Sequence, residues 1–130
     1  MAKLVKSIYT GADVTALGEL TDSDSIEHSV RGTVTTDNDL SFNMDVTNNF
    51  KCTPTGTGTL TFTNITAGQS GNIVIDNSGG YAISAASTTL ISAADLTKLS
   101  TAGVYFVSYY SADGSNAVVS VSPAVTSAGA

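Results

Sequence analysis

Charged residues are scarce in this chain of 130 amino acids, and most of them are acidic. Lysine, arginine, aspartate and glutamate together supply 12% of the sequence, about half the usual share for a soluble domain. Eleven acids against five bases give a net charge of −6. No window gathers the bases into a patch that could bind phosphates or an anionic membrane surface, so we expect binding to neither nucleic acid nor membranes.

Cysteine and histidine are nearly absent as well. The chain has one cysteine, Cys52, and one histidine, His28. A single cysteine can form neither an internal disulfide nor a CxxC site, so we expect a small buried side chain there. The histidine has no nucleophile motif beside it and no GxSxG elbow occurs, which predicts a protein that is not an enzyme and needs no cofactor. An enzyme that depends on His28, or on Asp22 and Asp24, is the formal alternative.

Long hydrophobic runs are also lacking. The first nine residues, MAKLVKSIY, contain no apolar segment of the length that a secretory signal needs. No run approaches the length of a transmembrane helix. We therefore expect synthesis and folding in a cytoplasm.

The sequence is rich in strand-like alternation. Apolar residues occupy every second position in LSFNMDV (40–46) and again in GTLTFT (58–63), a pattern typical of half-buried strands. TPTGTG (53–58) predicts a loop between them, so residues 40–63 are expected to form two antiparallel strands. SADGSN (111–116) is typical of a hairpin. Further strand-like runs lie at 29–35, 72–76, 81–84, 89–92, 104–110 and 117–122.

Short strands separated by Gly, Asn and Ser turns predict an all-β fold, an antiparallel β-sandwich of the jelly-roll or immunoglobulin-like type. We expect an N-terminal arm or connecting segment at 1–28, the sandwich at 29–123 and a C-terminal tail at 124–130. One short helix is expected within 92–100, where Ser92 can cap the first turn. The predicted core consists of Leu40, Phe42, Met44, Leu60, Phe62, Ile73, Ile75, Ile83, Val107 and Val119.

Acidic residues gather in DSDSIE (22–27). Because calcium binds clustered carboxylate oxygens, Asp22, Asp24 and Glu27 are weak candidates for a cation site, and Asp37 and Asp39 follow in DND. The segment lacks the glycine and the terminal glutamate of an EF-hand loop, and a solvated acidic turn is the alternative interpretation.

Aromatic residues occupy mainly strand positions, notably Tyr105, Phe106, Tyr109 and Tyr110. Carbohydrate-binding clefts often use aromatic rings, but the chain has no tryptophan. We therefore expect these side chains to serve a core or an interface.

Two parts of the sequence resemble structural proteins of tailed bacteriophages. GADVTALGELTDSDSIE (11–27) resembles an N-terminal segment of virion and tail proteins, in which Ala-Leu-x-Glu-Leu precedes an acidic turn and Asp-x-Ile. Residues 48–84 and 99–122 are similar to a β-rich module of such proteins. That module has a Thr-Leu-Thr-Phe strand, an Ala-Gly-Gln-x-Gly turn, an apolar strand and a late aromatic strand that ends in an Asp-Gly turn.

The resemblance implies a non-enzymatic virion protein. Small size and acidic charge favour a capsid decoration or cement protein on the outer head surface, where it would bind the major capsid protein and stabilise the shell. A homo-oligomer, dimer or trimer, is expected. The alternative is a tail-fibre or baseplate component that recognises a ligand on the host surface.

The segment AKLVKSIYT (2–10) is a candidate arm that could add a strand to the sheet edge of a neighbouring subunit. The first strand of the chain's own sandwich is the alternative. The residues expected to contact the partner are Lys3, Leu4, Val5, Lys6, Ile8 and Tyr9.

Overall fold

The computed structural model describes residues 32–127 of the chain. The chain divides into two units, Met1–Gly32 and Thr33–Ala130, and every helix and strand described below belongs to the second unit. The domain boundaries expected after residues 28 and 123 stay predictions.

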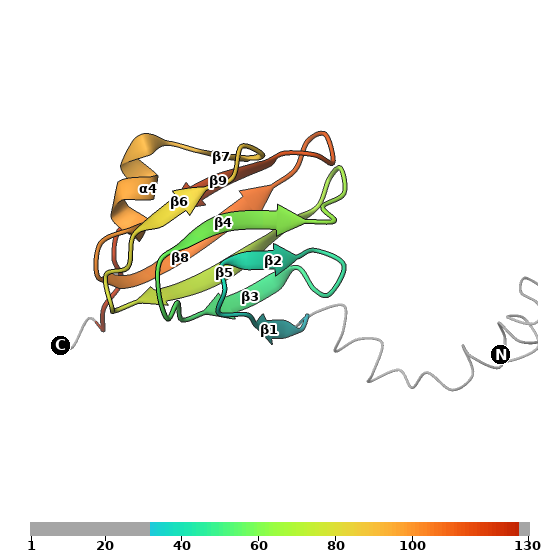
Figure 1. Ribbon diagram of the computed structural model, residues 1–130. Helices are drawn as coiled ribbons and strands as arrows, with labels where there is room; N and C mark the ends of the chain where they lie inside the picture. Colours follow the sequence, from blue (N-terminus) through green and yellow to red (C-terminus); the bar gives the residue numbers. More distant parts are fainter. Residues whose placement is uncertain (1–31, 128–130) are drawn as a thin grey trace, which may run out of the picture. The chain divides into compact units, whose positions relative to one another are not determined.

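The described strands form two sheets that lie one over the other (Figure 1). The six-stranded sheet contains, in spatial order, β1 (Val34–Thr36), β3 (Asn49–Cys52), β5 (Ser70–Asn77), β8 (Gly103–Tyr110), β9 (Ala117–Val121) and β7 (Thr89–Ile91). The three-stranded sheet contains, in spatial order, β2 (Ser41–Asn43), β4 (Gly58–Thr63) and β6 (Ile83–Ala85). One helix, α4 (Ala93–Leu99), follows β7 in the chain.

Successive strands in the first half of the described chain alternate between the two sheets. Strands β1, β3 and β5 belong to the larger sheet and pair in parallel, while β2, β4 and β6 belong to the smaller sheet and also pair in parallel. The chain therefore winds as a coil around the core. In the second half, β8 pairs antiparallel with both β5 and β9, and β7 pairs in parallel with β9.

The predicted antiparallel β-sandwich is therefore wrong, and the structure is a mixed α/β one with a mixed six-stranded sheet and a parallel three-stranded sheet. Residues 40–63 form three strands that do not pair consecutively, because the chain crosses from one sheet to the other at each connection. Leu40 shows how one crossing is made. It adopts a φ of 68° between β1 and β2, and its side chain is buried in the core. Alternation specifies which residues are buried but not which strand lies next to which.

The core lies between the two sheets, and aromatic contacts join the layers. The rings of Phe42 in β2 and Phe50 in β3 have centroids 5.0 Å apart, and those of Phe62 in β4 and Tyr109 in β8 are also 5.0 Å apart. All ten residues predicted for the core are buried, which confirms that part of the sequence analysis.

The predicted helix and hairpin are also confirmed. Helix α4 begins after Ser92, whose hydroxyl accepts a hydrogen bond from the backbone N–H of Asp95. Leu99 in the last turn is fully buried in the core, and Leu96 packs against the same cluster. Strands β8 and β9 are the two arms of the hairpin around residues 111–116, and Gly114 has the positive φ of 75° that the turn requires.

Candidate interaction surface

The six-stranded sheet has one face on the core and an opposite face, here called the outer face, that points away from the three-stranded sheet. Strand register places its side chains in rows across the strands. The Tyr110 row contains Leu90, Val118, Tyr110 and Ser70. The Ser108 row contains Ser120, Ser108, Asn72 and Asn49 and ends at Val34, which is exposed, and the Phe106 row contains Phe106, Val74, Lys51 and Thr36.

Two of these rows expose apolar side chains beside one another. Val118 is 51% exposed and Tyr110 is 50% exposed, and the two residues are register partners in β9 and β8. Phe106 is 45% exposed beside its partner Val74 in β5. Adjacent apolar groups on the surface of a soluble protein commonly mark a contact with another molecule.

Charge is almost absent from this face. Among the described strands of the six-stranded sheet, the charged residues are Lys51 in β3 and Asp76 in β5. The central Ser108 row is neutral, and it is polar from Ser120 to Asn49. The hydroxyl of Ser108 donates to Oδ1 of Asn72 at 3.1 Å, and the backbone N–H of Asn72 donates to Oδ1 of Asn49 at 3.3 Å. Hydroxyl and amide groups can both donate and accept, so this row can match many polar partners.

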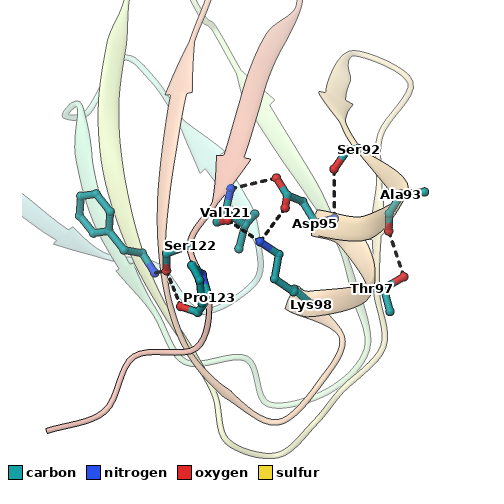
Figure 2. A network of polar contacts seen from close by, with 9 residues as sticks. Ser92, Ala93, Asp95, Thr97, Lys98, Val121, Ser122 and Pro123 are labelled. Atoms are coloured by element: carbon teal, nitrogen blue, oxygen red, sulfur yellow. Dashed lines mark hydrogen bonds and ion pairs between the residues drawn. The ribbon is translucent and has the colours of Figure 1, made fainter. Parts of the chain in front are cut away.

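Helix α4 covers the end of β9 that the edge strand β7 does not reach (Figure 2). Strand β7 pairs with Ala117–Val119 of β9 and stops before Val121. There, Oδ2 of Asp95 accepts a hydrogen bond from the backbone N–H of Val121 at 3.1 Å, and Nζ of Lys98 donates to its carbonyl oxygen at 2.7 Å. Asp95 and Lys98 also form an ion pair at 2.8 Å. This part of β9 is therefore satisfied within the chain.

A shallow depression of about 400 Å³ lies where β4 and β6 begin, on the three-stranded sheet. The hydroxyls of Thr59 and Ser84 are 2.8 Å apart at this depression. No acid, base or aromatic ring is among its lining residues, which are Thr57, Gly58, Thr59, Ala82, Ile83 and Ser84. The depression can offer hydrogen bonds but no acid–base chemistry.

The residues proposed from the sequence as partner or cation contacts lie outside the described residues. These are Lys3, Leu4, Val5, Lys6, Ile8 and Tyr9 of the arm, and Asp22, Asp24 and Glu27 of the acidic segment. His28, on which the alternative enzyme would depend, also lies outside them. Within residues 32–127, no three histidine, cysteine or acidic side chains gather as metal ligands would. Burial, followed by the neighbouring Asp39, raises the pKa of Asp37 above its usual value.

Cys52 is buried in the core, as predicted for a small filling side chain. Burial raises the pKa of its thiol to about 11. The thiolate that acts as a nucleophile or metal ligand is therefore disfavoured near neutral pH.

The sequence alone does not indicate the outer face, although it contains the aromatic residues that lie there. Tyr105 and Tyr109 point into the core and are buried, whereas Phe106 and Tyr110 alternate with them and are exposed. A usable signal was present, because both alternating sets of positions in VYFVSYY (104–110) carry apolar residues. A strand of this kind predicts contacts on both faces of its sheet.

No helix among residues 32–127 has the length and apolar character needed to cross a membrane. No family model matches the chain, and searches of curated proteins and of solved structures find no match.

Proposed function

We propose that this protein is a non-enzymatic structural component of a tailed-phage virion, a decoration or cement protein that binds the major capsid protein on the outer head surface. It would be made in the host cytoplasm and would stabilise the assembled shell. The observation that carries this proposal is the outer face of the six-stranded sheet, which exposes Phe106, Tyr110 and Val118 and has almost no charge. Such a face suits close contact between protein subunits.

The resemblance of residues 11–27, 48–84 and 99–122 to phage structural proteins supports the same role. The net charge of −6 also fits an outer position, because packaged DNA would repel an acidic protein. Modest affinity per contact is sufficient for a decoration protein, since several contacts on one lattice reinforce one another.

The deciding experiment is to count copies of the protein per purified virion by quantitative mass spectrometry, with the major capsid protein as internal standard. A copy number comparable with that of the major capsid protein supports a head decoration protein. A much smaller number assigns the protein to the tail, and absence from the particle overturns both virion roles. As a second measurement, heads that lack the protein should assemble but rupture at a lower temperature, and equal rupture temperatures would contradict a cement role.

The depression at the start of β4 and β6 favours a second candidate, a tail-fibre or baseplate protein that binds a host surface glycan. The side chains of Thr57, Thr59 and Ser84 bring hydroxyl groups to this depression, and hydroxyls can hydrogen-bond to sugars. A glycan array with the full chain tests this candidate. Specific binding that is lost in Ser84→Val but retained in Ser120→Val, a change on the outer face, would support it.

A further inference from the structure

We infer that the outer face of the six-stranded sheet packs against the outer face of a second copy of this chain, in a dimer with two-fold symmetry. The inference goes beyond a role in the virion, because it concerns the protein in solution. The dimer covers the outer face, so binding to the major capsid protein must either displace the second copy or use another part of the surface. The two-fold axis would pass through Ser108, which lies in the middle of the outer face. Ser108 belongs to β8, one of the two central strands of the sheet, and lies between Phe106 and Tyr110 along that strand.

The pattern of rows is self-complementary about this point. A two-fold axis at Ser108, directed either along or across the strands, sets Ser108 against its own copy. It also sets the rings of Phe106 and Tyr110 against aromatic rings of the partner, and Ser120, Ser108 and Asn72 against polar residues of the same row in the partner. Facing sheets in natural sandwiches keep their strands within about 30° of one another, so this match of rows is compatible with ordinary sheet packing.

The small number of charged residues on the outer face favours a second copy of the chain over a partner that binds through opposite charge. The charged residues of the described strands, Lys51 and Asp76, both lie away from Ser108. Lys51 is on β3, two strands from β8, and Asp76 is opposite Val104 near the start of β8. A two-fold axis at Ser108 therefore sets neither charge against its own copy. A basic or acidic partner would find no complementary patch on this face.

The size of the face is adequate for a stable contact. Strands β5 and β8 have eight residues each. Strand rise and spacing give the six-stranded sheet a flat footprint of roughly 500 Å². Side-chain relief makes the accessible area larger, which brings it near the ~800 Å² that each partner contributes to a standard interface.

The first test measures the dissociation constant of the full chain by sedimentation equilibrium. We expect a dimer, and we expect the double variant Phe106→Thr/Tyr110→Thr to raise the dissociation constant by at least about 30-fold, as for loss of an interface hot spot. Threonine keeps the strand preference of both positions. The control Val46→Thr removes an apolar residue that is 56% exposed in the connection between β2 and β3, and should leave the constant unchanged.

The second test locates the symmetry axis. The variant Ser108→Cys should give a covalent dimer with a short thiol–thiol cross-linker, because each new cysteine faces its own copy. Thr59→Cys, on the exposed side of the three-stranded sheet, should give little cross-linked product. The unaltered chain should give none, since its Cys52 is buried.

The results separate this inference from its competitors. A monomeric or trimeric full chain would overturn it, and so would a dimer that cross-links at Thr59 but not at Ser108. A monomer that loses thermal stability on replacement of Phe106 and Tyr110 would show that another part of the same chain covers the face, which also overturns the inference. The copy number in virions bears only on the virion role, so either proposal can fail without the other.

Discussion

The carboxylate of Asp95 in α4 accepts a hydrogen bond from the backbone N–H of Val121 in β9 at 3.1 Å. Lys98, one helical turn later, donates to the carbonyl oxygen of the same residue. The two side chains take the place that a neighbouring strand would occupy along the end of β9. A sheet edge closed in this way cannot pair with another chain at that point.

Replacing Asp95 by asparagine should weaken the fold at neutral pH and have less effect in acid. The ion pair with Lys98, together with the bond from Val121, holds the pKa of Asp95 below its usual value of 3.8. Its contribution to stability is therefore present above the pKa of the unfolded state and is lost as pH falls through the lower pKa of the folded state. Urea unfolding should show a loss of about 1 kcal/mol at pH 7.

The same measurement repeated in acid checks the mechanism. Below both pKa values the difference between the parent chain and Asp95→Asn should nearly disappear. Asp45→Asn, in an exposed position after β2, is the matched control and should change stability little at either pH. An equal loss for Asp95→Asn at neutral and acid pH would rule out the ionised carboxylate as the cause.

Gly71 in β5 should not tolerate alanine. A Cβ atom at this position would lie 1.8 Å from the carbonyl oxygen of Asn48 and 2.6 Å from the hydroxyl of Tyr109. That hydroxyl donates to the same carbonyl at 2.7 Å, so one methyl group would displace both partners of a bond that ties β8 to the loop before β3. We expect Gly71→Ala to reduce the free energy of unfolding by about 3 kcal/mol.

Gly56 provides the control for this prediction. A Cβ atom at Gly56 would meet nothing within 4 Å, so Gly56→Ala should be close to neutral or slightly stabilising. Chemical denaturation of the two variants gives the comparison. Similar free energies of unfolding for the two variants would mean that the loop before β3 can move away from the new methyl group without destabilising the fold.

Cys52 should not react with thiol reagents in the folded protein. Its side chain is buried, and burial raises its pKa to about 11, so little thiolate is present at pH 8. Labelling by a chromogenic disulfide reagent should be slow under native conditions and complete in denaturant. The variant Thr59→Cys, which places a second thiol on the exposed side of β4 and away from the outer face, should label rapidly at one site in the folded state. Rapid labelling of the parent chain would contradict the burial of Cys52.

Asn77 is fully buried, and its side chain joins the segment before β6 to the end of α4. Its Nδ2 donates to the carbonyl oxygens of Leu99 and Tyr81, and its Oδ1 accepts from the backbone N–H of Tyr81. Asn77→Asp replaces the donor by an acceptor that faces two carbonyl oxygens, and we expect a loss of about 3 kcal/mol at pH 7. Thermal unfolding at pH 7 and in acid should show partial recovery when the carboxyl is protonated.

Asn43→Asp is the corresponding change at a position on β2, away from the outer face. Its Oδ1 accepts from the backbone N–H of Asp45 and from Nδ2 of Asn64, and a carboxylate can still do so, so the change should cost little stability. A large loss at Asn43, or none at Asn77, would show that burial does not decide the effect.

The sequence predicted the burial of individual residues better than the pairing of strands. Leu60 and Phe62 were expected in the core because they alternate with threonines, and both are buried. Alternation is a local property of a strand, whereas pairing depends on how each connection runs. Leu40 and Asn64 adopt positive φ values without being glycine, so the positions where the chain turns were poorly marked in the sequence.

The candidate surface could be predicted only in part. Tyr105 and Tyr109 are buried, as expected for a core role, while Phe106 and Tyr110 are exposed, and the period of two separates the pairs once the strand is known. What the sequence did not indicate is that Leu90 and Val118 continue the same row across two further strands. That continuity depends on the parallel pairing of β7 with β9, which no local pattern specifies.

The winding of the chain between the two sheets also constrains how the protein can be made. All eight residues of β5 pair with β8, and the pair that closes this ladder joins Ser70 to Tyr110. During synthesis, β5 leaves the ribosome well before its partner β8. The parallel strands that precede β5 form no local hairpin with one another that could begin folding. The β8–β9 hairpin and α4 supply local contacts, and both follow these parallel strands in the sequence. The six-stranded sheet can therefore form only after β8 has been made, and it should form at the slow rate typical of distant strand pairing.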